Sequence, residues 1–208
     1  MIALVDYGVG NLFSLKSSFA AIGADVQVTG DPAEIRQADR IILPGVGAFE
    51  DAAAKLRATG LDAVLRERAA AGVPLMGICL GMQLLFDRSL EYGDHPGLGL
   101  IPGTVRPIAE VIDPALKIPH IGWNALHFPK KHPLFRYLSE GDYVYFVHSY
   151  YAADCDDSVI AETEYSAPLT AAVARGNVMG CQFHPEKSGE VGLAILRAFC
   201  EYEKGENP

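Results

Sequence analysis

The residues with the clearest capacity for chemistry form the segment 77–81, Gly-Ile-Cys-Leu-Gly, which follows the apolar run Val-Pro-Leu-Met at 73–76. A nucleophile with glycine two residues before and two residues after it, between a strand and a helix, is the pattern of a nucleophile elbow. Because this turn is tight, a side chain at either flanking position would collide with the neighbouring strand or helix. The turn also brings the sulfur to a helix N-terminus, where exposed N–H groups favour the thiolate. We therefore expect Cys79 to be a nucleophile, although a lone cysteine after a buried strand is usually a small core residue.

A cysteine nucleophile needs a base, and the segment 178–186, Val-Met-Gly-Cys-Gln-Phe-His-Pro-Glu, supplies one. A short apolar strand runs into His184, and Pro185 should end it. His184 and Glu186 are two residues apart, so in an extended segment their side chains lie on one side. Glu186 can then hold the imidazole in one tautomer, while His184 takes the proton of Cys79 and delivers it to a leaving amine. Alone, a His-Pro-Glu motif is usually a loop, but its occurrence together with the elbow, each at a strand end, favours a Cys-His-Glu triad.

The order of these three residues along the chain bears on the fold family. The inferred order is Cys, His, Glu, whereas an α/β-hydrolase places its acid before its histidine. The α/β-hydrolase family therefore fits poorly.

A third strand end, at 40–49, reads Arg-Ile-Ile-Leu-Pro-Gly-Val-Gly-Ala-Phe. Attack of a thiolate on an amide produces an oxyanion, which needs N–H donors fixed at about 3 Å. Glycine reaches dihedral angles that other residues avoid, so a Gly-Val-Gly loop can aim backbone N–H groups inward. We predict one oxyanion donor in this loop, with Gly45 and Val46 as its candidates, and a second at the N–H of Leu80. Standing alone, the loop would be a plain turn between a strand and a helix.

The segment 6–11, Asp-Tyr-Gly-Val-Gly-Asn, contains the start of a dinucleotide-binding fingerprint. The third glycine of that fingerprint is missing, because its position is occupied by Phe13. A glycine-rich turn that joins the first strand to its helix is therefore the favoured interpretation.

Composition predicts one α/β domain over 1–208, because the chain has 208 residues, of which 50% are hydrophobic and 21% charged. A net charge of −9 argues against nucleic acid as a main partner. The four cysteines have neither paired nor metal-like spacing, so we expect reduced thiols, no metal and a cytoplasmic location. No run approaches the length of a membrane span, and the N-terminus reads as a first strand rather than a signal peptide.

The first half of the chain alternates strands and helices, and its apolar runs lack alternation, as expected of a parallel sheet buried on both faces. We predict strands at 2–6, 25–29, 40–44 and 73–78, and helices at 12–22, 32–38, about 49–71 and 79–87. The second half has short strand-like pieces near 103–112 and 122–128, strands at 142–151, 158–164, 169–175 and 178–183, and a closing helix near 188–203. Residues 88–96 and 126–140 match no motif and are interpreted as surface loops.

Together these motifs resemble the class I (triad-type) glutamine amidotransferases, and within them the glutaminase subunits of imidazole glycerol phosphate synthase in histidine biosynthesis. The resemblance spans essentially the whole chain and implies a flavodoxin-like α/β fold, with a central, mostly parallel sheet flanked by helices. The elbow and the His-Pro-Glu motif point to the superfamily, while the Pro-Gly-Val-Gly loop and His-Ile-Gly-Trp-Asn at 120–124 point to the subfamily. The matching segments are 6–12, 43–49, 77–86, 97–103, 119–124, 145–150 and 182–188.

The resemblance also implies a reaction, and no cofactor takes part in it. Cys79 attacks the side-chain amide of glutamine, giving a γ-glutamyl thioester and ammonia, and water then releases glutamate. The ammonia passes to a (β/α)₈-barrel synthase (cyclase) subunit, which makes imidazole glycerol phosphate and an aminoimidazole carboxamide ribonucleotide. A closed route between the two sites is physically sensible, because free ammonia in neutral water is mostly protonated and then cannot attack.

The resemblance further implies contacts to the substrate and to the partner. The implied substrate contacts are Gly47, Gln83, His148, Ser149 and Tyr150, and the implied partner contacts are Asn11, Trp123, Tyr145 and Lys187. From the residues alone, Gln83 could equally be an ordinary residue of a helix's first turn, the segment 145–150 a half-buried strand, and Trp123 a core residue.

Two other functions remain open at this point. One is a stand-alone thiol hydrolase of the same superfamily, such as a γ-glutamyl peptidase, which would need no partner. The other is a non-catalytic binding module with this fold, although such modules generally lose a triad residue and this chain keeps all three.

Overall fold

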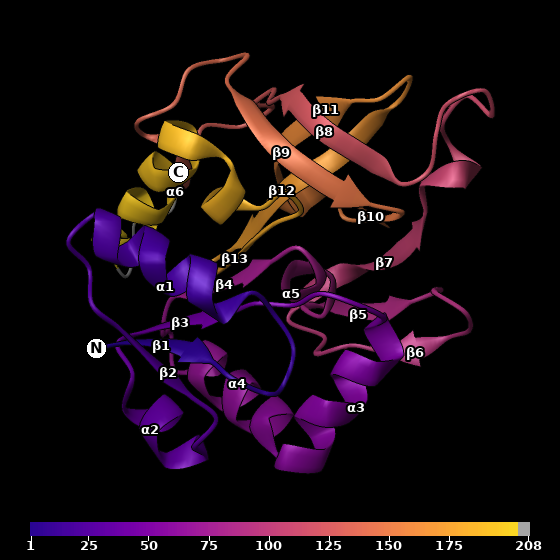
Figure 1. Ribbon diagram of the computed structural model, residues 1–208. Helices are drawn as coiled ribbons and strands as arrows, with labels where there is room; N and C mark the ends of the chain where they lie inside the picture. Colours follow the sequence, from indigo (N-terminus) through magenta and orange to yellow (C-terminus); the bar gives the residue numbers. More distant parts are fainter. Residues whose placement is uncertain (204–208) are drawn as a thin grey trace.

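The computed structural model describes residues 1–203, and their centre is a seven-stranded sheet with helices on both faces (Figure 1). The strand order is β11-β12-β13-β4-β3-β1-β2, in which the last five strands are parallel, β12 is antiparallel to β13, and β11 is antiparallel to β12. The strands are β1 (Ile2–Val5), β2 (Val26–Thr29), β3 (Arg40–Leu43), β4 (Leu75–Ile78), β11 (Val159–Glu164), β12 (Pro168–Arg175) and β13 (Val178–Cys181).

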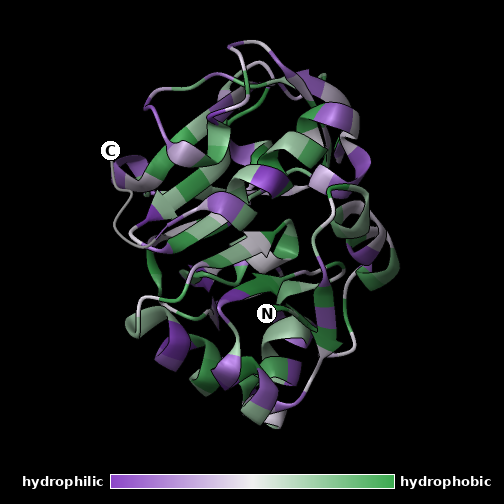
Figure 2. Cartoon of the chain, turned by 90° about the vertical axis from the view of Figure 1, so that its left-hand side faces the viewer, coloured by the Kyte–Doolittle hydropathy of each residue, from purple (hydrophilic) through white to green (hydrophobic). Residues whose placement is uncertain are grey.

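Both faces of this sheet are covered because successive side chains of a strand point to opposite sides. In β1, Ala3 and Val5 pack into one buried cluster, while Leu4 packs into the other. The first cluster lies under α2 (Pro32–Gln37), α3 (Phe49–Thr59) and α4 (Leu61–Ala70), and the second under α1 (Leu12–Ala21) and α6 (Gly189–Glu201). Figure 2 shows the result, with hydrophobic strands at the centre and hydrophilic residues on the outer turns of the helices.

Two smaller sheets of the described chain lie beside the central one (Figure 1). The four-stranded sheet has the order β10-β7-β5-β6, and the two-stranded sheet pairs β8 with β9. Their strands are β5 (Phe86–Ser89), β6 (His95–Pro96), β7 (Ile101–Pro107), β8 (His120–Ala125), β9 (Tyr143–His148) and β10 (Tyr150–Ala153). Short 3₁₀ helices occur at Ile108–Glu110, Pro133–Phe135, Asp156–Ser158 and Pro185–Lys187.

The helix predicted at 79–87 was wrong in length, because α5 covers only Leu80–Gln83. The carbonyl oxygens of Leu84 and Leu85 accept hydrogen bonds from the backbone of residues 98, 100 and 101 instead of continuing the helix. The chain then enters β5, so 88–96 is not simply a surface loop but holds the end of β5 and all of β6. The strand predicted at 142–151 is likewise two strands, β9 and β10, with Ser149 between them.

The segment 126–140 was also wrongly interpreted as a surface loop. Leu126, Leu134 and Phe135 are buried in the cluster that packs under α6. None of the helices within residues 1–203 has the length and apolar character that crossing a membrane requires.

Candidate active site

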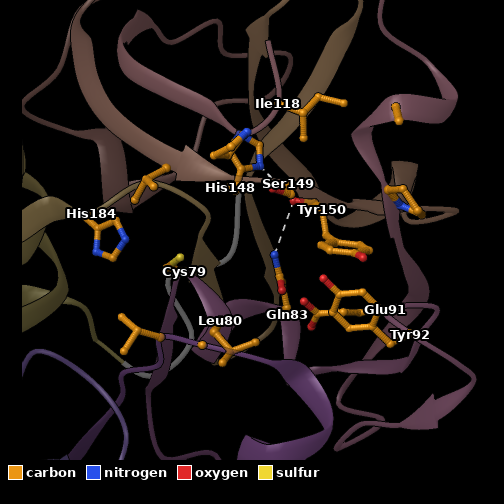
Figure 3. A pocket seen from close by; sticks show the side chains of 16 residues that line it. Cys79, Leu80, Gln83, Glu91, Tyr92, Ile118, His148, Ser149, Tyr150 and His184 are labelled. Carbon is orange, nitrogen blue, oxygen red and sulfur yellow. Dashed lines mark hydrogen bonds between the residues drawn. The ribbon is translucent and has the colours of Figure 1, made fainter. Parts of the chain in front are cut away.

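A cavity of about 590 Å³ brings together most of the residues that the sequence singled out (Figure 3). The segments that reach it include the loop after β3, the turn between β4 and α5, the segment after β5, the junction of β9 and β10, and the segment after β13. Cys79 and His184 lie at one end of this cavity, and Tyr92 and Tyr150 lie toward the other (Figure 3). The elements of the central sheet therefore supply the reactive groups, and the smaller sheets supply the opposite wall.

Cys79 occupies the turn between β4 and α5 with φ 55° and ψ −112°. A positive φ is strained for a residue with a side chain, and such strain is typical of functional turns. The flanking glycines permit the turn, because a Cβ at Gly81 would lie 1.9 Å from the carbonyl oxygen of Leu43. A Cβ at Gly77 would lie 2.5 Å from the carbonyl oxygen of Gly81. The collision predicted from the spacing is thus present at both flanks.

His184 follows β13 and is held by a carboxylate from the next turn. Its Nδ1 lies 2.8 Å from Oε1 of Glu186, and both side chains are at most 3% exposed. With Nδ1 engaged in this way, Nε2 is the nitrogen that faces Cys79. Burial lowers the pKa of His184, but the hydrogen bonds with Cys79 and Glu186 outweigh burial and raise that pKa to about 9. The arrangement therefore favours an imidazolium beside the sulfur at neutral pH.

Gln182 is a member of the site to which sequence analysis gave no role. Its side chain is fully buried, and its Nε2 donates to Sγ of Cys79 at 3.7 Å. Its Oε1 accepts a hydrogen bond from Nε2 of Gln83 at 2.9 Å. The alternation of side chains could have found it, because Gln182 stands two residues before His184, the same spacing that pairs His184 with Glu186.

The loop predicted to hold an oxyanion donor packs directly against the elbow. A Cβ at Gly45 would lie 2.8 Å from the backbone nitrogen of Gly81, so only glycine fits this contact. Val46, Gly47 and Leu80 line the cavity, and Gly47 has φ +95°. The structure thus brings the loop and the backbone of Leu80 to the same end of the cavity as Cys79, while their role as donors stays a prediction.

Tyr7, which sequence analysis did not select, anchors this loop from the segment that had suggested a dinucleotide site. Its hydroxyl donates to the carbonyl oxygen of Pro44 at 2.7 Å in a buried position. Burial, with a smaller contribution from Cys79, raises the pKa of Tyr7 well above its ordinary value, so the hydroxyl stays a donor. Gly10 of the same segment packs closely on Pro44, where an added Cβ would lie 2.9 Å from the proline Cβ.

The wall opposite Cys79 holds three of the five implied substrate contacts, together with two residues from the segment 88–96 that no motif marked. His148, Ser149 and Tyr150 all line the cavity, as does Gln83. Both ring nitrogens of His148 are already engaged, Nδ1 with the carbonyl oxygen of Tyr150 at 2.8 Å and Nε2 with Nδ1 of His120 at 2.9 Å. His148 can therefore offer a ligand only its ring face and its backbone.

The two unmarked residues are Glu91 and Tyr92, from the segment interpreted as a loop. Oε2 of Glu91 accepts a hydrogen bond from the backbone of Phe49 at 2.6 Å, at the first residue of α3. Tyr92 has φ 53°, is 86% exposed and lies edge-on to the ring of Tyr150. Their position depends on the pairing of β5 with β6 and β7, and the local sequence does not predict that pairing.

Three of the four residues implied as partner contacts form one cluster on β8, β9 and the turn after His184. Trp123 is 54% exposed, which excludes a core position, and it lies edge-on to Tyr145 with ring centroids 6.2 Å apart. Nζ of Lys187 lies 5.8 Å from the centre of the Tyr145 ring. Asn11 instead caps α1, where its side chain accepts from the backbone of Ser14 at 3.4 Å. Within residues 1–203, no three His, Cys, Asp or Glu side chains are placed to hold a metal ion.

Comparison with known proteins gives matches over nearly the whole chain. The family model "Glutamine amidotransferase class-I" matches residues 3–201. The chain is 51% identical over 205 residues to an imidazole glycerol phosphate synthase subunit HisH of Sulfurimonas denitrificans, covering 97% of this chain and 98% of the relative. It is 49% identical over 201 residues to the HisH subunit of Lactococcus lactis, covering 96% and 98%. A crystal structure of a glutamine amidotransferase shares the fold with a TM-score of 0.76 at 19% identity, covering 97% of this chain and 98% of the other.

Proposed function

The chain belongs to the class-I glutamine amidotransferase family, and on that premise we propose that it is the glutaminase subunit of an imidazole glycerol phosphate synthase. The resemblance drawn from its motifs is confirmed by relatives about half identical to it, and the expected fold by the family match. One observation carries the proposed chemistry. A strained cysteine between β4 and α5 shares the cavity with a buried histidine whose pKa it raises, and a buried carboxylate lies 2.8 Å from that histidine.

In the proposed first step, the thiolate of Cys79 attacks the side-chain carbonyl carbon of glutamine. Negative charge collects on the carbonyl oxygen, where the N–H of Leu80 and one from the Gly45–Val46 loop would stabilise it. The imidazolium of His184 gives its Nε2 proton to the amide nitrogen as the C–N bond breaks, and ammonia leaves. The carbon–sulfur bond remains as a γ-glutamyl thioester.

The second step uses the same residues in reverse. Neutral His184 takes a proton from water while the water oxygen attacks the thioester carbonyl carbon. The C–S bond then breaks, glutamate leaves, and the thiolate and imidazolium are restored. Glu186 keeps Nδ1 of His184 engaged throughout, so the same nitrogen faces the reacting atoms in both steps.

The cavity also offers groups that suit the zwitterionic end of glutamine. Glu91 places a carboxylate in the lining, which suits the α-ammonium group of the substrate. Gln83 and the backbone and hydroxyl of Ser149 supply polar groups for the α-carboxylate. We assign Gly47 and Tyr150 to the walls that enclose the substrate, and we assign His148 to holding the strand junction rather than to a ring-nitrogen contact.

The proposed partner, a (β/α)₈-barrel cyclase subunit, would dock on the outer face of the β8–β9 pair. Trp123 stands opposite Tyr145 and Ile121 opposite Val147, so these four side chains share one face of the pair. Ile121 and Trp123 are more than half exposed, and Val147 lines the cavity. The exposed face therefore continues into the wall of the active site, which suits direct transfer of ammonia. The free state of all four cysteines fits the cytoplasmic location that we also propose.

The test measures glutamate release from glutamine by wild type, Cys79→Ala and the matched control Cys200→Ala, which changes a cysteine of α6 outside the cavity. Each is assayed alone and with a cyclase subunit carrying its ligand. We expect low activity alone, stimulation by the liganded partner, complete loss in Cys79→Ala and retention in Cys200→Ala. High activity that ignores the partner would instead indicate a stand-alone thiol hydrolase. No activity under any condition would indicate a non-catalytic binding module.

A further inference from the structure

A chain of hydrogen bonds runs from β8 to the sulfur of Cys79, and the function proposed above uses only its last members. It begins at Asn124, whose amide orientation the backbone fixes. Oδ1 of Asn124 accepts from the backbone nitrogen of Ala125 at 2.9 Å, and Nδ2 donates to the carbonyl oxygen of Glu164 at 2.8 Å. The group that Asn124 turns toward Nε2 of His120, at 3.4 Å, is therefore an N–H donor.

This donor determines the tautomer of His120. Because Nε2 of His120 accepts, the proton of the neutral ring lies on Nδ1. Nδ1 is the atom 2.9 Å from Nε2 of His148, so His120 donates and His148 accepts. The ring of His120 is held in this plane by stacking, with centroids 4.1 Å from Tyr165 and 5.1 Å from Phe146.

The hydrogen bonds of His148 require the same direction of donation, from His120 to His148. Nδ1 of His148 lies 2.8 Å from the carbonyl oxygen of Tyr150, which can only accept, so His148 carries its proton on Nδ1 (Figure 3). Both rings are neutral, as this pattern needs. Burial lowers the pKa of His148 to about 4 against a smaller opposing effect of the bond to Tyr150, with His120 and His184 adding to the lowering. Burial also lowers the pKa of His120.

The Tyr150 carbonyl, which the N–H of His148 holds in place, orients two glutamines. It also accepts from Nε2 of Gln83 at 3.4 Å, which sets the direction of that amide. Nε2 of Gln83 donates to Oε1 of Gln182, so Gln182 turns its own Nε2 toward Sγ of Cys79. An N–H donor at this place stabilises negative charge on sulfur, whereas a reversed Gln182 would place an oxygen there and oppose that charge.

We propose that His120 is a positioning residue that holds His148 in its Nδ1–H tautomer. The N–H of His148 in turn holds the Tyr150 carbonyl where Gln83 donates to it. This contact keeps the N–H of Gln182, rather than its oxygen, against Cys79. His120 itself does not line the cavity. Its importance for turnover rests on the proposed function, but its effect on the tautomer of His148 and on the reactivity of Cys79 does not.

The test compares three variants of the full chain. His120→Phe keeps an aromatic ring between Tyr165 and Phe146 but removes the donor, and His120→Asn keeps an N–H near the place of Nδ1. His127→Phe is the matched control, because His127 is exposed and pairs with Glu140 outside the chain of hydrogen bonds. The readouts are the imidazole ¹⁵N spectra and the rate of Cys79 alkylation by iodoacetamide at pH 7, followed by mass spectrometry of the Cys79 peptide.

In wild type we expect both His120 and His148 to appear as neutral Nδ1–H tautomers at pH 7. Alkylation of Cys79 slows by about tenfold in His120→Phe, which is the scale of one hydrogen bond to a charged group. It is largely restored in His120→Asn and unchanged in His127→Phe.

Three outcomes would each overturn the proposal. The first is a charged or Nε2–H His148 in wild type, and the second is an unchanged rate of Cys79 alkylation in His120→Phe. The third is an equal fall in that rate in His120→Phe and His120→Asn, which would indicate that His120 acts only through packing. The wild-type spectrum decides the tautomer even where a variant fails to fold. Absence of glutamine hydrolysis by the wild-type complex would contradict the proposed function and leave both readouts intact.

Discussion

At the scale of single residues, the site depends on a histidine whose surroundings act in opposite directions. Burial of His184 disfavours its charge, yet hydrogen bonds with Cys79 and Glu186 more than compensate. An imidazolium in this place is ready to give a proton to a leaving amine, which a neutral ring could not do. The interactions of the His184 imidazolium with Cys79 and Glu186 also stabilise the fold. Titration of His184 is therefore measurable as a change in the free energy of unfolding.

The folded pKa of His184, about 9, lies above its ordinary value of 6.5. Its stabilising contribution is therefore complete below about pH 6.5 and is lost as pH rises through about 9. We expect the free energy of unfolding, measured by urea titration, to fall over this interval in wild type. In Cys79→Ala, where one of the two partners is gone, the fall should be smaller and should finish at lower pH.

The difference between the two proteins cancels the contributions of Cys155 and Cys200. Burial raises the pKa values of both thiols, and Cys79 does not contribute to either shift, so they contribute equally in both proteins. Parallel stability curves for wild type and Cys79→Ala would contradict the raised pKa of His184.

At the scale of elements, sequence patterns predicted the strands and turns whose structure is determined by interactions between residues close in sequence. The strands β1, β3 and β4 contain unbroken apolar runs, and the elbow and the His-Pro-Glu motif are complete within short segments. The helix α5 was overestimated because its end is set by hydrogen bonds from residues 98 to 101. The remaining omissions have the same cause, since Tyr7, Glu91 and His120 reach the site only through strand pairings and loops distant in sequence.

The junction of β4 and α5 gives the prediction at this scale. In Gly81→Ala the added Cβ would lie 1.9 Å from the carbonyl oxygen of Leu43, so β3 or the elbow must move. We expect a loss of about 3 kcal/mol in the free energy of unfolding, the upper range for overpacking. Because displacement of the elbow also moves Cys79, glutamine hydrolysis should fall by at least about a hundredfold.

The control for this prediction is Gly60→Asn, between α3 and α4. Gly60 has φ +71° with no neighbouring atom within 4 Å of a Cβ, and asparagine tolerates this left-handed conformation. We expect its unfolding free energy to stay within about 1 kcal/mol of wild type and its activity to be unchanged. If Gly81→Ala matches Gly60→Asn in both measurements, the elbow accommodates the added Cβ and the predicted collision with Leu43 is wrong.

At the scale of the whole molecule, the two kinds of sheet divide the work. The central sheet holds Cys79 and His184 at the ends of the adjacent strands β4 and β13, inside a core that covers both of its faces. The β8–β9 pair adds a wall whose outer face carries Ile121, Trp123 and Tyr143, each more than half exposed. The reaction produces ammonia beside this wall, and the proposed docking face lies on the same strand pair. Both features fit one assembly, in which a second subunit closes the cavity.

The last prediction tests that docking face with two aromatic residues of equal exposure. Trp123 is 54% exposed on β8, and Tyr137 is 53% exposed on the segment that packs near α6. In Trp123→Ala, affinity for the cyclase subunit, measured by calorimetry, should fall by roughly 30-fold or more, as for a buried aromatic anchor. Tyr137→Ala should change the affinity by less than about twofold, because loss of an exposed aromatic outside an interface removes no contact with the partner. Partner-stimulated glutamine hydrolysis at limiting cyclase should fall with affinity in the first variant and not in the second. Equal effects of the two changes would place the docking face elsewhere on the molecule, since exposure alone does not distinguish these residues.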